Sequence, residues 1–115
     1  MNKELLEEVL GYNIDYIASS GETYIGFHTE LGGSQINIYE LSFKCKQYAL
    51  KRGYILDSQS RSYCKGKGIC FIYLDDWTSE FPEYCLESFS ADSEIEAIFK
   101  ASEWIKNKKE KDNDM

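Results

Sequence analysis

Apolar residues recur at helical spacing in three stretches of the chain, residues 2–11, 37–53 and 93–105. Two of these stretches begin with a capping-box pattern, in which a small polar residue precedes a glutamate by three positions. Asn37 precedes Glu40 in this way, and Ser93 precedes Glu96. The pattern therefore predicts three helices, each with one apolar side. Lys106 lies beyond the apolar stripe of the last helix, so replacing it by alanine is expected to change stability by less than about 0.5 kcal/mol.

Between the helices, β-branched and aromatic residues alternate with polar residues, which is the period of β-strands. Residues 12–19 and 22–30 are expected to form a hairpin near a sheet edge, and residues 54–60 and 84–91 to form two further strands. Residues 69–74, with the sequence ICFIYL, are apolar at six consecutive positions. A strand that is apolar on both sides is expected to be covered on both sides, so this strand is predicted to be central.

The order of these elements predicts an α+β fold, a small and mostly antiparallel sheet sandwiched by helices (α-β-α). The last helix is expected to cover one side of the sheet, and the second helix, with the first, to cover the rest. Residues 1–107 form one domain in this interpretation, residues 108–115 a polar and frayed tail, and residues 31–34 a loop. Four residues are predicted to be buried in the core: Cys45, Ile72, Ile98 and Phe99.

Composition excludes global disorder and a membrane-spanning helix. The chain has 115 residues, of which 43% are hydrophobic and 15% aromatic, enough to build a core. Its apolar runs all fall well short of the roughly 18–20 residues that a bilayer span requires. The first residues are acidic and lack the basic region and cleavage site of a signal peptide. A soluble protein in the cytoplasm is expected.

The sequence holds four cysteines, Cys45, Cys64, Cys70 and Cys85, and one histidine, His28. The close ligand pairs that zinc sites normally show are missing from it, so the cysteines are predicted to be reduced thiols without a metal. A Cys–His pair for catalysis could be built only with His28, and nothing in its local sequence supports one. CKGKG, residues 64–68, lacks the glycine spacing of a phosphate-binding loop. We therefore expect no enzyme and no cofactor.

The charge of −7 is unevenly distributed along the chain. Residues 41–67 hold seven basic residues and one acid, whereas residues 68–99 hold eight acids and no lysine or arginine. Such blocks are also typical of ordinary solvated surface. The acidic block suggests one candidate binding set, in the connection after the central strand: Asp75, Asp76, Glu80 and Glu83. The basic block suggests an alternative set: Lys44, Lys51, Arg52, Arg61, Lys65 and Lys67.

Three stretches together resemble a known family of small phage proteins. They are LLEEVLGY near the start, INIYELSFKCKQYALKRGYIL in the middle and FSADSEIEAIFKASEWI near the end. Each pairs an amphipathic helix with a glycine-aromatic ending or a preceding strand, in the order seen in the phage ABA sandwich domain family. The stretches cover about half of the chain. The resemblance implies an α-β-α fold and an origin in a phage or prophage, and it implies no catalytic residue.

These observations lead to a functional expectation. A small acidic chain without a catalytic constellation suits a phage- or prophage-encoded accessory protein that acts by protein binding. Its expected partner is a host or defence protein with a basic surface, such as a CRISPR effector that it would inhibit. The alternative is a nucleic-acid- or nucleotide-binding module that uses the basic residues between 44 and 67, although the net negative charge would oppose binding of phosphates.

Overall fold

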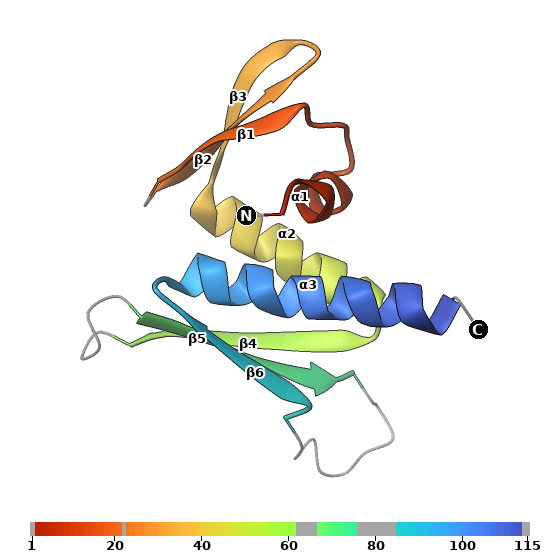
Figure 1. Cartoon of the computed structure of the whole chain (residues 1–115). Coiled ribbons are helices and arrows are strands. Elements are labelled where there is room, and N and C mark those ends of the chain that lie inside the picture. The colour runs from red at the N-terminus through yellow and green to blue at the C-terminus, as the bar shows by residue number, and fades with distance from the viewer. Residues whose placement is uncertain (1, 22, 62–66, 76–84, 114–115) are drawn as a thin grey trace.

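The computed structural model describes residues 2–21, 23–61, 67–75 and 85–113 of the chain, which form three helices and six strands (Figure 1). The helices are α1 (Lys3–Leu10), α2 (Ile38–Lys51) and α3 (Glu94–Asn113). The strands are β1 (Tyr16–Ser20), β2 (Tyr24–Thr29), β3 (Gly32–Asn37), β4 (Tyr54–Arg61), β5 (Lys67–Leu74) and β6 (Glu87–Ala91). The predicted α+β class is confirmed. Within the described residues, no helix is long and apolar enough to cross a membrane.

The helices begin where the capping residues of the sequence predicted. The side chain of Asn37 accepts a hydrogen bond from the N–H of Tyr39 at 2.8 Å, and Ser93 Oγ accepts one from the N–H of Glu96 at 3.3 Å. Gly11 ends α1 with a φ of 84°, a left-handed conformation that glycine adopts without steric cost. These local signals were sufficient to place the helices in the chain.

The strands divide between two antiparallel sheets, which we call sheet A (β1-β2-β3) and sheet B (β4-β5-β6). The β1–β2 hairpin was expected, but β3 occupies residues that were in part expected to form the loop 31–34. Gly32, with a φ of 112°, lets the chain reverse directly after Thr29, and β3 then pairs with β2 along its whole length. Pairing with β2 thus makes a strand of a glycine-rich segment whose own sequence favours a loop.

The layers also differ from a single sheet between helices. Figure 1 shows the helices between the two sheets, with α2 and α3 on the same face of sheet B. On β5, Cys70 and Ile72 face these helices and are fully buried. Phe71 and Tyr73 alternate with them and remain half-buried. The central strand was expected to be covered by helices on both faces. This expectation is wrong, because the helices that the structure describes cover only one face of sheet B.

One core connects the helices and both sheets. All four residues that were predicted to be buried are buried: Cys45, Ile72, Ile98 and Phe99. Gly68 on β5 marks a close approach between sheet B and the start of α3, because a Cβ atom at this position would collide with the backbone of Ser93 and Glu94. The Ser58 hydroxyl donates a hydrogen bond to Glu94 Oε1 at 2.7 Å and fixes the start of α3 on β4.

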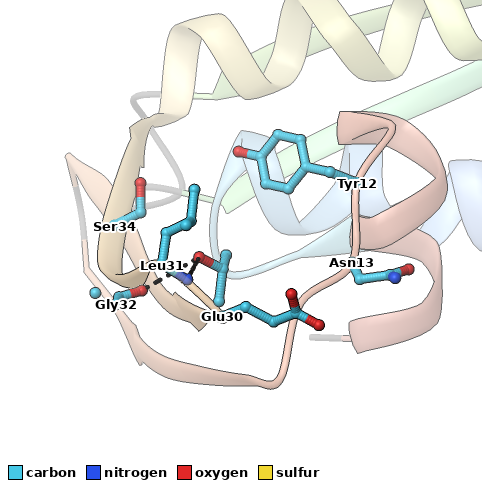
Figure 2. A pocket seen from close by; sticks show the side chains of 8 residues that line it. Tyr12, Asn13, Glu30, Leu31, Gly32 and Ser34 are labelled. Atoms are coloured by element: carbon cyan, nitrogen blue, oxygen red, sulfur yellow. Dashed lines mark hydrogen bonds between the residues drawn. The ribbon is translucent and has the colours of Figure 1, made fainter.

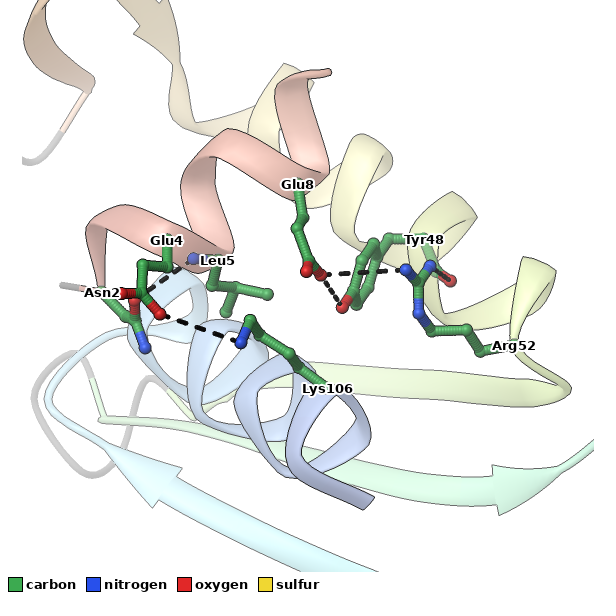
Figure 3. A network of polar contacts seen from close by, with 7 residues as sticks. All are labelled: Asn2, Glu4, Leu5, Glu8, Tyr48, Arg52 and Lys106. Carbon is green, nitrogen blue, oxygen red and sulfur yellow. Dashed lines mark hydrogen bonds and ion pairs between the residues drawn. The ribbon is translucent and has the colours of Figure 1, made fainter. Parts of the chain in front are cut away.

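Lys106 departs from its expected exposed position. Only 8% of the residue is accessible, and its ammonium nitrogen lies 4.0 Å from Glu4 Oε2 (Figure 3). The sequence placed Lys106 beyond the stripe of α3, but α1 packs against this part of α3 and covers the aliphatic stem of the lysine. Its predicted negligible contribution to stability is therefore not supported by its environment.

Candidate binding surfaces

The acidic connection that the sequence suggested as a binding set is only partly described. Asp75 follows β5 directly, is half-buried, and donates its backbone N–H to the carbonyl oxygen of Gly53 at 2.9 Å. Asp76, Glu80 and Glu83 lie outside the described residues. Asp75 is thus the one member of this set whose surroundings can be stated, and it lies at the end of sheet B where β5 ends.

The structure does not bring the basic set together into one surface. Lys44 and Lys51 lie on α2 and Arg52 directly after it, whereas Arg61 and Lys67 are paired in register at the far end of the β4–β5 hairpin. Lys65 lies outside the described residues. The seven-residue step along β4 from Tyr54 to Arg61 spans about 23 Å at 3.3 Å per residue, so Arg61 and Lys67 lie far from Arg52 at the other end of the strand. The described basic residues therefore do not form one continuous patch.

Arg52 has a structural role that the sequence did not indicate (Figure 3). Its guanidinium carbon lies 3.7 Å from the centre of the Tyr48 ring, and Nη2 lies 3.8 Å from Glu8 Oε2. The Tyr48 hydroxyl donates to the same carboxylate oxygen at 2.6 Å. The three side chains join α1 to α2, so the positive charge of Arg52 is partly neutralised within the fold.

Three cysteines and the histidine lie within the described residues, and two of these cysteines are buried. Burial raises the pKa of Cys45 and of Cys70 to about 12, which keeps both protonated at neutral pH. Cys85 is exposed, and Cys64 lies outside the described residues. His28 Nδ1 lies 3.3 Å from Asp15 Oδ2, and its ring stacks on an exposed tyrosine of β1. Among the described residues, no cluster of three or more histidine, cysteine or acidic side chains could hold a metal ion.

A hollow of about 490 Å³ lies between the β2–β3 hairpin and the segment after α1 (Figure 2). Tyr12 and Asn13 form one wall, and the hairpin residues from Thr29 to Ser34 form the other. Thr29 Oγ1 accepts a hydrogen bond from the N–H of Leu31 at 3.2 Å, which shapes the turn. Leu31 is fully exposed at the tip. Glu30 is the one carboxylate in this lining.

Sheet B has an outer face on the side away from α2 and α3, on which an apolar ridge lies among polar residues. The strand register assigns it these residues: Ile55, Asp57, Gln59, Lys67, Ile69, Phe71, Tyr73, Ser88 and Ser90. Ile69, Phe71 and Tyr73 form a ridge along the central strand, and Ile55, which is 43% exposed, extends it onto β4. The serines on β6 form a small polar rim. We call this surface the outer face of sheet B.

A smaller hollow of about 370 Å³ opens at one end of this face, where β4 begins and β5 ends. Its lining is mainly apolar and combines Ile55 and Tyr73 with Leu74, which is 52% exposed. The exposed carboxylate of Asp57 lies on its border, and Asp75 follows Leu74 directly. The sequence showed that residues 69–74 are apolar on both sides, but it did not show which side the helices would leave open.

Comparisons of the chain with protein-family models, with curated proteins and with solved structures found no match. The resemblance to the phage ABA sandwich domain family therefore stays a prediction, and the function has to be argued from the surfaces of this chain.

Proposed function

We propose that the protein acts by binding another protein, and that the outer face of sheet B is the contact surface. One observation carries this proposal: the central strand β5 is apolar on both sides, and the described helices cover only one of them. Antiparallel sheets that face water on one side normally place polar residues there. A contiguous apolar ridge on an exposed sheet face is typical of an interaction surface.

The negative charges at one end of the face, where β4 begins and β5 ends, support a partner that carries cationic groups beside an apolar patch. Asp57 borders the hollow that Ile55 and Tyr73 line, so a lysine or arginine could bury its aliphatic stem there and place its charge near this carboxylate. Asp75 follows Leu74, which also lines the hollow, and adds a second negative charge at this end of the sheet. The net charge of −7 would also accelerate encounters with a basic surface. These features agree with the expected partner, a host or defence protein with a basic surface.

The nucleic-acid alternative receives less support from the geometry. Aromatic side chains on a sheet can stack with bases, and Phe71 and Tyr73 are suitably placed for this. However, Asp57 is paired in register with Phe71 on the same face, and its carboxylate would repel a phosphate backbone. The described basic residues lie in two groups, on and directly after α2 and at the end of the β4–β5 hairpin, rather than along one groove.

The biological setting belongs to the same proposal. A small acidic binding protein from a phage or prophage would inhibit a host or defence protein by occupying its basic functional surface. The proposal requires only a tight and specific contact, since no reaction is needed for such inhibition.

Affinity capture from bacterial lysate, with a matched pair of surface variants, tests this function. Ile55→Thr combined with Phe71→Thr replaces two apolar side chains of the ridge by β-branched polar threonines, which strands accept. Leu31→Ser is the control, because it removes a fully exposed apolar side chain from the turn between β2 and β3, away from sheet B. We expect the control to retain the captured protein and the double variant to lose it, with both variants folded by circular dichroism. Retention by the double variant together with loss by the control would refute the proposed surface.

A further inference from the structure

Helix α2 carries a second apolar stripe on the side opposite its buried one. Leu41, Cys45 and Tyr48 face the core, whereas Tyr39 and Phe43 are 76% and 61% exposed. Leu50, which is 53% exposed, continues the stripe because positions four and eleven residues after Tyr39 lie on the same side of a helix. A helix at a protein surface normally presents polar residues on this side.

An open hollow of about 240 Å³ lies beside the first half of this stripe. Side chains of α2 and the first residues of α3 form its walls: Ile38, Tyr39, Ser42, Phe43, Lys46, Glu94 and Ile95. The lining is mostly apolar, and its volume suits one aliphatic side chain. The chain itself exposes such a side chain, Leu50, on the same helix about two and a half turns further on.

Opposite charges lie at the two ends of one flank of the stripe, so two antiparallel copies of the helix would place unlike charges side by side. Glu40 lies in the first turn of α2 and Lys51 in the last, on the same flank. If a second α2 packs antiparallel on the stripe, each Glu40 comes close to Lys51 of the partner subunit. The same arrangement brings Tyr39 opposite Leu50 of the partner subunit, and Phe43 opposite Lys46 of the partner subunit. A lysine over an aromatic ring is a favourable contact.

We propose that two copies of the chain associate through α2, with the helices antiparallel about a two-fold axis. Leu50 of each copy enters the hollow beside Tyr39 of the other, so the same patch serves both subunits, as a two-fold interface requires. This contact uses residues separate from the outer face of sheet B, and the proposal does not depend on the proposed function.

The size of the interface determines how strong the association is. The 14 residues of α2 span about 21 Å, and the three exposed apolar side chains with their borders bury roughly 500 Å² on each copy. A total near 1,000 Å² is at the low end of specific interfaces, so we expect a dissociation constant on the order of 10–100 µM. The protein is then a monomer at low micromolar concentration and a dimer at several hundred micromolar.

Analytical ultracentrifugation over this concentration range measures the mass directly. We expect the weight-average mass to rise from the 13.3 kDa of one chain towards twice that value. Phe43→Ser should keep the mass of a monomer at every concentration, and Leu31→Ser, on sheet A, should dimerise like the unchanged protein. A monomeric mass at about 500 µM for the unchanged protein would overturn the proposal.

Charge reversal tests the antiparallel pairing separately from helix stability. Glu40→Lys and Lys51→Glu each place like charges against one another, so each variant alone should dimerise at least about threefold more weakly. An equal mixture of the two restores both opposite-charge pairs, and its mass should exceed that of either variant alone at the same total concentration. Each variant keeps its own helix in the mixture, so altered helix stability cannot produce this rescue. A mixture that associates no better than its components would refute the antiparallel dimer.

Discussion

Gly68→Ala should strongly destabilise the fold, because sheet B approaches the backbone at the start of α3 closely at Gly68. A Cβ atom there collides with backbone atoms of Ser93 and Glu94, which cannot move aside as the end of a flexible side chain could. Forcing extra volume into a packed core costs about 1–3 kcal/mol. A displaced α3 also loses the 2.7 Å hydrogen bond from Ser58 to Glu94, which adds about 1 kcal/mol. The expected loss of unfolding free energy is therefore about 2–4 kcal/mol.

Urea denaturation monitored by circular dichroism measures this loss, with Gly33→Ala as the matched control. Gly33 also lies in a strand, but nothing comes within 4 Å of a Cβ atom built on it, and its φ is not in the left-handed region. The control should therefore stay within about 0.5 kcal/mol of the unchanged protein. If Gly68→Ala were as mild as the control, α3 would not begin on β5, and the packing of sheet B described above would be wrong.

Three further predictions follow from buried side chains. Lys106→Ala should lower the unfolding free energy by about 1–2 kcal/mol in urea denaturation, because the buried stem packs between α1 and α3; a change below about 0.3 kcal/mol would contradict its burial. Tyr48→Phe removes the 2.6 Å hydrogen bond to the α1 carboxylate and should cost about 1–2 kcal/mol by the same assay, whereas an unchanged midpoint would show that the bond does not form. In the folded protein at pH 8, alkylation followed by mass spectrometry should modify Cys85 and spare Cys45 and Cys70. Because burial raises the pKa of the last two thiols from 9.0 to about 12, their contribution to stability is complete below pH 9 and is lost as the pH rises towards 12. Alkylation of all three thiols at equal rates would refute their burial.

Local features of the fold could be predicted from the sequence, because the interactions that produce them lie within a few residues. Asn37 and Ser93 cap their helices with hydrogen bonds to residues two or three positions away. The apolar spacing of α2 and α3 likewise identified Cys45 and Ile98 as core residues. Such signals do not depend on where the rest of the chain lies.

Features that depend on distant partners could not be predicted in this way. Strand β3 begins with two glycines and becomes a strand only because β2 pairs with it. Lys106 is buried by α1, which is about one hundred residues earlier in the chain. The division of the strands into two sheets and the placement of both long helices on one face of sheet B are equally non-local.

The residues around the outer face of sheet B could likewise be predicted only in part, because some of them are brought together by distant pairing. Asp75 was identified from the density of acids along the sequence, but Asp57 was not, because it is a single acid within a basic block. The two come to the same end of sheet B only through the antiparallel pairing of β4 with β5. The apolar face between them depends on which side of the sheet the helices leave open.

Side-chain footprinting with hydroxyl radicals tests the proposed contact surface most directly. In the free protein, Phe71 and Tyr73 should be oxidised more readily than Phe27, which lies in the core. Addition of the captured partner should lower oxidation of Phe71 and Tyr73 at least about fivefold, while the exposed Leu31 on sheet A keeps its rate. Protection of this kind would support the outer face of sheet B as the binding surface. Unchanged oxidation of both aromatic residues in a saturated complex would contradict it.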